Sequence, residues 1–373
     1  MSKNSLSRGI STLKVAATYI GTVVGSGFAS GQEILQFFAI FGLNGFLGLI
    51  IVTALFIFYG YIIMNLGKTF NSFSYLDVIK KAGGRYIAPI LDFLITFFLF
   101  GSLTAMVAGS GAIFKQQFKI PEIWGNLVMI ILTTITVLMG IKGVINSISF
   151  VVPFLLVVAF GVSIYSLFFI PSNQNQEYYS FGNGLVGNWL WAAILYASYN
   201  IIISASVLAP LGNNAKDNTA IKRGSVLGGA FLGLGAAAIY ITLSRSLNEI
   251  MFMEVPMAHI AGKASYPVQI IYIIVLLAEI YTTAVGSLYG FTARLCHSNN
   301  KLNIYIFALK QKKSLNIHRI NKIIIIFTAI LAFLASKYGF SNLVSYMYPI
   351  MGYGGCVLLI SLLYYFVKEK VYK

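Results

Sequence analysis

The sequence predicts an all-α integral membrane protein with ten membrane-spanning helices. Of its 373 residues, 58% are hydrophobic and only 10% are charged, and the mean hydropathy is +0.82. A soluble globular domain carries about 25% charged residues, so this chain has too few charges to cover a surface that faces water. Its outer surface must therefore face lipid, where the backbone hydrogen bonds have to be satisfied within the protein.

Ten apolar runs are long enough to span a bilayer, which takes about 20 residues. They are residues 10–41, 44–67, 87–114, 123–141, 146–170, 187–212, 222–247, 268–296, 320–338 and 341–366. Residues 10–170 and 187–366 hold five runs each, within one transmembrane domain that covers residues 1–373. The first run is too long to be the apolar core of a cleaved signal peptide.

The Lys and Arg residues of the loops predict the orientation. With the N-terminus inside, 21 of the 26 Lys and Arg residues lie on the inner side and five on the outer side. Basic loops remain in the cytoplasm, so both termini are expected there. The net charge of +16 follows from these loops, and it does not indicate a nucleic-acid partner.

Two connecting segments are expected to be structured. Inner residues 72–85 alternate apolar and polar residues at helical spacing and end in two glycines, which predicts a short interfacial helix with a glycine stop. Outer residues 249–267 are long and partly apolar. They either form a lid over an outer vestibule or lie at the membrane interface, and the sequence favours neither.

The first span contains an unusual cluster of small and polar residues. Residues 21–33, GTVVGSGFASGQE, hold four glycines, two serines and one acid. Each glycine costs about 1 kcal/mol in a helix interior, and bare backbone is tolerated at membrane depth only where protein buries it or it lines a cavity. Gly25 and Gly27 cannot share one helix face. An unwound segment is therefore favoured over close packing through small residues.

A second interruption is expected in the sixth span. Tyr196, Ser198, Tyr199 and Asn200 lie mid-span, and Pro210 lies near its end. This signal is weaker, because a serine side chain can bond to its own helix. Spans one and six open two sets of five helices, and interrupted helices at matching positions of inverted repeats indicate a transport site near the midplane. The expected fold is a 5+5 inverted repeat with spans one and six broken.

Glycine pairs in the seventh span indicate close helix packing. Gly224 and Gly228, and likewise Gly229 and Gly233, are four residues apart and have no polar neighbours. The face that they form either packs inside the protein or joins a second copy, and the oligomeric state stays open.

Three acids fall within or near the spans, where a charge is costly and usually functional. Asp92 lies near an inner helix end and is expected to be solvated, whereas Glu33 and Glu279 are deeper. One helical turn places the carbonyl of Glu279 beside the hydroxyls of Thr282 and Thr283. Such oxygens are hard ligands for a small cation, although span eight taken alone is better explained by threonines bonded to their own helix.

The motif Gly21-x-x-Val24-Gly25-x-Gly27, with ten spans and both ends inside, resembles the amino acid–polyamine–organocation superfamily with the LeuT fold. Within it, the chain is similar to the YkvI-like branch of bacterial membrane proteins, which implies a location in the cytoplasmic membrane of a bacterium.

The resemblance implies a sodium ion between spans one and eight. Its ligands would come from Gly21, Val24, Glu279, Thr282 and Thr283. The substrate would be bound by Gly25, Ser26, Gly27, Tyr199 and Asn200. A substrate carboxylate would then meet the amides of residues 25–27, at the positive end of the outer half-helix.

The chain also departs from the family pattern. The acid at Glu33 is unexpected, and Glu33 and Glu279 are candidate proton sites. Some proton-coupled relatives place a lysine in span five, and residues 146–170 contain none, which favours sodium.

The expected function is secondary active transport of a small carboxylate-bearing metabolite, an amino acid by default, through alternating access. A proton-coupled transporter of an amino acid or osmolyte is the alternative, as is a channel or receptor of the same fold. An enzyme is not expected, since His259, His297 and His318 lie in loops or at a span end and form no catalytic motif. The expected partners are the bilayer and the substrate, with no cofactor besides the coupling Na⁺ or H⁺.

Overall fold

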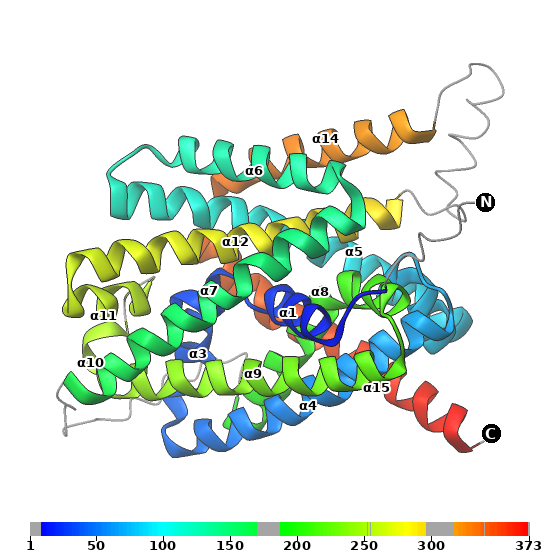
Figure 1. Ribbon diagram of the computed structural model, residues 1–373, viewed down its shortest axis with the longest axis horizontal. Coiled ribbons are helices and arrows are strands. Elements are labelled where there is room, and N and C mark those ends of the chain that lie inside the picture. Colours follow the sequence, from blue (N-terminus) through cyan, green and yellow to red (C-terminus); the bar gives the residue numbers. More distant parts are fainter. Residues whose placement is uncertain are drawn as a thin grey trace, which may run out of the picture.

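The computed structural model describes residues 9–169, 187–251, 253, 255–295, 317–338 and 340–371. Its elements are α1 (Thr12–Val23), α2 (Ser26–Ser30), α3 (Gln32–Phe37), η1 (Ala39–Phe41), α4 (Leu43–Thr69), α5 (Tyr75–Phe118), α6 (Glu122–Leu138), α7 (Gly140–Phe169), α8 (Trp189–Asn214), α9 (Asn218–Ser244), α10 (Leu247–Ile250), α11 (Pro256–Ala264), α12 (Tyr266–Leu295), α14 (Ile317–Ala335), η2 (Ser336–Tyr338) and α15 (Phe340–Val371). The long helices lie alongside one another along the longest axis (Figure 1).

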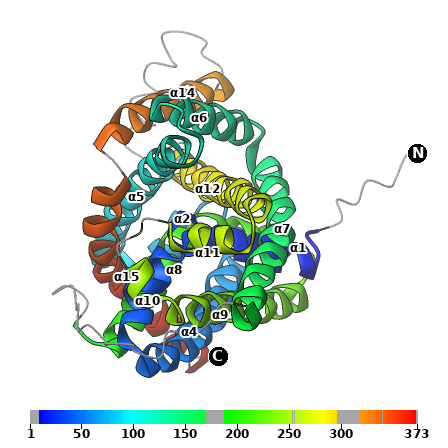
Figure 2. The same cartoon turned by 90° about the vertical axis from the view of Figure 1, so that its left-hand side faces the viewer.

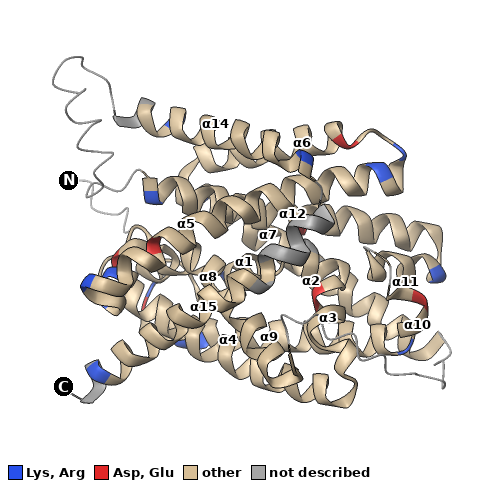
Figure 3. Ribbon diagram, turned by 180° about the vertical axis from the view of Figure 1, so that it is seen from behind, with Lys and Arg blue, Asp and Glu red and all other residues tan. Residues whose placement is uncertain are grey.

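The expectation of an all-α membrane protein with ten spans is confirmed. Eight described helices are long and apolar enough to cross a membrane: α4, α5, α7, α8, α9, α12, α14 and α15. The fourth span is the shorter apolar helix α6, and the first span is divided into α1, α2, α3 and η1. Lys and Arg lie toward the two ends of the bundle, and its middle is almost free of them (Figure 3).

The first span is broken where the glycine cluster predicted it. Val24 and Gly25 have extended backbone conformations between α1 and α2. A second break follows at Gly31, whose φ of +84° is left-handed and therefore suits a residue without a Cβ. A Cβ there would also lie 2.9 Å from Cγ of Met257. The chain thus needs glycine at this position for two independent reasons.

Segment 72–85 forms a short helix, as predicted, and its position at the membrane interface remains a prediction. The Oγ atom of Ser74 accepts a hydrogen bond from the amide of Leu76 at 3.3 Å and so caps the start of α5. Gly84, with φ of 59° and ψ of −156°, is non-helical and separates this short helix from the third span. The glycine stop is confirmed.

The glycines of α9 pack closely against other helices of the same chain. A Cβ at Gly224 would lie 2.5 Å from the side chain of Val15, and one at Gly228 would lie 2.6 Å from Tyr19. Gly229 and Gly233 meet α4 in the same way, at Ile57 and Thr53. The small-residue face therefore joins α9 to α1 and α4, and it is an internal packing surface.

The predicted break in span six is wrong, because α8 is one continuous helix from Trp189 to Asn214. Its polar side chains bond to the helix itself: Ser198 Oγ donates to Leu195 O at 2.9 Å, and Asn200 Nδ2 donates to Tyr196 O at 3.0 Å. These local bonds satisfy the polar groups without unwinding the backbone.

The expectation of a solvated Asp92 is also wrong. Arg294, near the end of α12, donates from Nε to Asp92 Oδ1 at 2.8 Å and from Nη2 to Oδ2. The Arg294 and Asp92 side chains are only 17% and 15% exposed. The hydroxyl of Tyr75 donates to the same carboxylate at 3.4 Å. The pair therefore ties α12 to both parts of α5, a contact across 202 residues that no local pattern signals.

We expect Asp92→Asn to lower thermal stability, because it leaves a mostly buried guanidinium without its carboxylate. The expected loss is about 1–3 kcal/mol, seen as a lower unfolding midpoint of the detergent-purified protein. Glu122→Gln is the control, since the Lys115–Glu122 pair is 67% and 50% exposed and such pairs contribute about 0–1 kcal/mol. Equal midpoint shifts for the two variants would contradict this assignment.

Candidate functional site

The break in the first span faces α12. The hydroxyl of Thr283 donates to the carbonyl oxygen of Val24 at 2.7 Å. This carbonyl lies at the end of α1, where a helix leaves its last carbonyls without intrahelical partners. A Cβ at Gly25 would lie 3.0 Å from the same hydroxyl, so any larger residue would press on Thr283. Spans one and eight therefore meet where the sequence predicted an ion site.

Glu279 places a buried carboxylate in α12, one helical turn before Thr283. Thr282 Oγ1 donates to the backbone carbonyl of Glu279 at 2.9 Å and lies 3.4 Å from its Oε2 atom. The Oε1 atom is buried and has no hydrogen-bond partner among the described residues. An unsatisfied buried carboxylate oxygen is costly. The Glu279 side chain is therefore poised to take up a cation or a proton.

The structure does not bring all five predicted ion ligands into one contact. Val24 and Thr283 touch, while Thr282 bonds within its own helix, as the sequence allowed. Gly21 packs against α7, where a Cβ would lie 2.5 Å from Ile148. Its role as an ion ligand remains a prediction.

The second buried carboxylate belongs to Glu33 in α3, which is 4% exposed. The hydroxyl of Tyr199 in α8 donates to its Oε2 atom. Its Oε1 atom lies 2.1 Å from the position that a Cβ of Gly27 would occupy. Glu33, Gly27 and Tyr199 therefore converge from the first and sixth spans. Gly27 and Tyr199 belong to the predicted substrate site and Glu33 is a predicted proton site, and these roles remain predictions.

Aromatic rings surround this carboxylate. Tyr199 contacts Tyr196 edge-on at 5.4 Å between ring centroids and stacks on Tyr348 of α15 at 5.1 Å. Phe37 of α3 packs against Tyr196 and Tyr199 at 5.6 and 5.9 Å. No sequence pattern identifies Tyr348, because an aromatic residue in an apolar span has the same pattern whether it faces lipid or a site.

The remaining predicted substrate residues are Asn200 and Ser26. Asn200 is buried, and its side-chain amide bonds to its own helix. The side chain of Ser26 lies outside the described residues. A further residue that the sequence did not single out is Tyr272 of α12, whose hydroxyl donates to the Ala29 carbonyl at 2.5 Å. It holds α2 against α12 on the outer side of the break.

The outer segment 249–267 covers the bundle from one end. Helix α11 crosses the middle of the molecule in front of α2 (Figure 2), and the two helices are in contact. Met257 of α11 is fully buried and packs on Gly31. The segment thus packs over the broken span, and its role as a lid remains a prediction.

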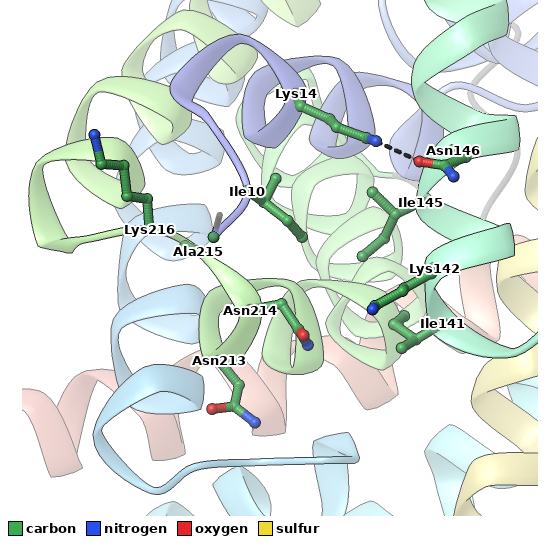
Figure 4. Close-up of a pocket in the computed structure, with 11 residues that line it drawn as sticks. Ile10, Lys14, Ile141, Lys142, Ile145, Asn146, Asn213, Asn214, Ala215 and Lys216 are labelled. Atoms are coloured by element: carbon green, nitrogen blue, oxygen red, sulfur yellow. Dashed lines mark hydrogen bonds between the residues drawn. The ribbon is translucent and has the colours of Figure 1, made fainter. Parts of the chain in front are cut away.

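A polar cavity of about 770 Å³ opens at the other end of α1 (Figure 4). Lys14, Lys142 and Asn146 line it together with the end of α8, and no acidic residue is among its lining residues. The start of α1 is tied to the α8–α9 connection, because Ile10 N donates to Asn214 O at 2.9 Å. The cavity thus lies between α1 and α7, on the side predicted to be cytoplasmic.

The two buried carboxylates lack a fixed positive partner in the described part of the chain. Its four ion pairs involve other acids: Glu122, Asp92 and, twice, Glu249. Burying an unpaired ionised carboxylate is strongly unfavourable. The site is therefore built to receive positive charge.

Comparison with known proteins supports the family and the fold. The chain is 30% identical to the membrane protein YkvI of Bacillus subtilis (strain 168) over 353 residues, which cover 95% of each chain. It is also 30% identical to YyaD of the same organism over 352 residues, or 94% of this chain and 96% of that protein. No family model matches the chain.

Solved structures share its architecture. A Na⁺-coupled sialic acid symporter in a substrate-bound outward-open state superposes with a TM-score of 0.67 at 12% identity, over 95% of this chain and 79% of that one. MhsT in complex with L-phenylalanine gives 0.64 at 16% identity, over 94% and 88%. Inward-facing Mhp1 gives 0.58 at 13% identity, over 96% and 77%. The predicted LeuT fold is confirmed.

We expect Gly25→Leu to abolish ligand binding and transport while leaving membrane insertion intact. The new side chain would displace Thr283 from the Val24 carbonyl, because even a Cβ comes within 3.0 Å of its hydroxyl. Gly161→Leu is the matched control, since a Cβ there meets no atom within 4 Å. Normal uptake by Gly25→Leu in membrane vesicles would contradict the role of the break.

The cover formed by α11 should loosen at low pH. Lys263 holds the pKa of Glu249 below its usual value, and His259, 3.0 Å from the same carboxylate, lowers it further. Because the pKa of Glu249 is lowered, its ionised carboxylate stabilises the folded state at pH values above its usual pKa near 4.5. This contribution is lost as the pH falls through the lowered pKa.

Hydrogen exchange of residues 256–264, corrected for intrinsic rates, should show less protection at pH 3 than at pH 6. Glu249→Gln should reproduce the low-pH result at neutral pH, whereas Glu122→Gln, which removes a carboxylate paired with Lys115 of α5, should not. Unchanged protection in Glu249→Gln would rule out this anchoring role.

Proposed function

Because the chain belongs to the family of the bacterial membrane protein YkvI and has the LeuT fold, we propose that it is a secondary active transporter. The proposed substrate is a small metabolite with a carboxylate, with an amino acid as the first choice, and the proposed coupling ion is sodium. The relatives show the family, and the solved structures show the fold. The substrate and the ion rest on the geometry of the site.

One observation carries the proposal most directly: the hydrogen bond between Thr283 and Val24 at the break of the first span. It places a hydroxyl and a carbonyl oxygen 2.7 Å apart, between two helices from opposite halves of the chain. Hard oxygen atoms of this kind suit Na⁺. A bound ion would turn the hydroxyl proton away and use both oxygens, which would strengthen the contact between spans one and eight.

The nearby carboxylate of Glu279 supports a cation at this place. Its Oε1 atom is buried without a partner in the described part of the chain, and a positive ion would compensate both the burial and the charge. Because Thr282 holds the backbone carbonyl of Glu279, the carboxylate is a more accessible ligand than that carbonyl.

Alternating access needs a path from the site to each side of the membrane, and the two ends of the first span provide candidate paths. On the outer side α11 lies over α2, and on the predicted inner side a cavity borders the start of α1. Between this cavity and the break, Gly21 of α1 packs tightly on Ile148 and Val152. Separation of α1 from α7 at Gly21 would open the inner path, and movement of α11 would open the outer one.

Ion coupling provides enough free energy for uphill transport. One cation moving down about 100 mV releases about 2.3 kcal/mol, and each 1.4 kcal/mol corresponds to a tenfold change. The membrane potential alone would therefore support about fortyfold accumulation of the substrate. A ligand drives the conformational change only if it binds the two states with different affinity.

Proton coupling is the second candidate, and the buried carboxylates of Glu33 and Glu279 favour it. Each could release and bind a proton as the site opens to either side. In this case the stabilising effect of sodium would be absent, and substrate binding would follow pH.

We expect sodium to raise the thermal stability of the detergent-purified protein, whereas potassium at the same concentration should not. Saturation at 100 times the dissociation constant would add about 2.7 kcal/mol. Thr283→Val should remove the response to sodium. Thr292→Val is the matched control, because the buried Thr292 hydroxyl bonds only within its own helix, to Leu288 and Tyr289. Thermal stability that does not depend on sodium but depends on pH would indicate that a proton is the coupling ion.

A further inference from the structure

The position of Glu33 bears on which chemical group the site recognises. Its carboxylate packs over the α-carbon of Gly27, where a Cβ would lie 2.1 Å from Oε1 and 2.6 Å from the carboxyl carbon. Gly27 lies in the first turn of α2, directly after the break. A carboxyl group of the protein therefore already packs against Gly27, one of the residues that would receive a substrate carboxylate.

If both buried carboxylates of the site are ionised, their charge calls for more than one positive partner. Glu33 and Glu279 are 4% and 0% exposed, and neither belongs to an ion pair within the described residues. A sodium ion at the junction of Val24, Thr283 and Glu279 would balance one of these carboxylates. The second, at Glu33, would still need a positive partner.

The surroundings of Glu33 suit an organic cation. The Tyr199 hydroxyl donates to the carboxylate and orients it. The rings of Phe37, Tyr196, Tyr199 and Tyr348 form a connected cluster next to it. Ring faces attract ammonium groups in water-poor sites, whereas a proton on the carboxylate would not need an aromatic cluster.

We propose that the transported substrate carries a protonated amine and that Glu33 binds this amine beside Gly27. This inference rests on the proposed transport function and names the group by which the same site selects its substrate. The amine is the required group, and the carboxylate is secondary. An amino acid satisfies both, an amine without a carboxylate is accepted, and a carboxylic acid without nitrogen is rejected because its charge would meet that of Glu33.

The test compares matched sets of compounds on the full-length protein in sodium-containing buffer. Each set consists of an amino acid, its amine and its acid: leucine with 3-methylbutylamine and 4-methylpentanoate, phenylalanine with phenethylamine and 3-phenylpropionate, and alanine with ethylamine and propionate. Thermal stabilisation and isothermal titration report binding. We expect at least one set in which the amino acid and the amine bind and the acid does not.

The variants then identify the residue. Glu33→Gln should weaken binding of the amine by about tenfold or more, because the lost partner is a buried charge, and Glu33→Asp should retain part of the affinity. The sodium response at Thr283 should persist in Glu33→Gln, which shows that the variant is folded. Glu122→Gln, a carboxylate remote from the site, should bind as the unmodified protein does.

Several outcomes would overturn the proposal: binding of the acids without the amines, failure of every amine-bearing compound to bind at millimolar concentration, or unchanged affinity in Glu33→Gln. Binding could also depend on pH in the unmodified protein but not in Glu33→Gln, with no preference for amines. That result would assign a proton to Glu33 and would reject the amine proposal. Amines that bind through Glu33 but are not taken up by vesicles would leave this site in place and refute the transport function instead.

Discussion

The hydrogen bond from Thr283 to the Val24 carbonyl is the contact on which the centre of this protein depends. A helix that stops in the middle of a membrane leaves carbonyl groups without partners, and lipid offers none. Here the hydroxyl of another span supplies the partner at 2.7 Å, and Gly25 allows the approach. The break is therefore stable only because α12 lies against it, and the two halves of the chain are joined at this point.

The distribution of charge follows from the same constraint. The basic residues lie toward the ends of the bundle, while Glu33 and Glu279 are buried in its interior (Figure 3). The Glu33 carboxylate packs against Gly27 at the start of α2, and Glu279 lies in α12 one helical turn before Thr283, which contacts the end of α1. An apolar bundle with two interior acids favours ligands that bring positive charge, which links an ion site and a substrate site through electrostatics alone.

The elements around the site are held by different kinds of contact. Helices α5 and α12 are joined by the Asp92–Arg294 pair, and α9 packs its glycines against α1 and α4. Helix α11 is held by its buried apolar face, which includes Met257 and Ile260, and by the half-exposed ion pairs of Glu249. The cover over the broken span therefore rests mainly on apolar burial, and the ion pairs add a contribution that depends on pH.

The amino-acid pattern was sufficient to predict the class of fold, the ten spans, the interfacial helix ending at Gly84 and the break after Val23. Each of these depends on local physics: hydrophobic length, helix periodicity and the cost of glycine within a helix. The same reasoning failed for the sixth span, since Ser198 and Asn200 have two ways to satisfy their polar groups, and the continuous helix uses the local one.

Only the tertiary structure decided which distant groups share a site. The approach of Thr283 to Val24, of Tyr199 to Glu33 and of Arg294 to Asp92 joins residues separated by 259, 166 and 202 positions. Tyr348 shows the same limit, because a tyrosine in an apolar span has one sequence pattern for either face of its helix. The direction in which a helix turns each face is set by how the spans pack, and packing depends on the whole chain at once.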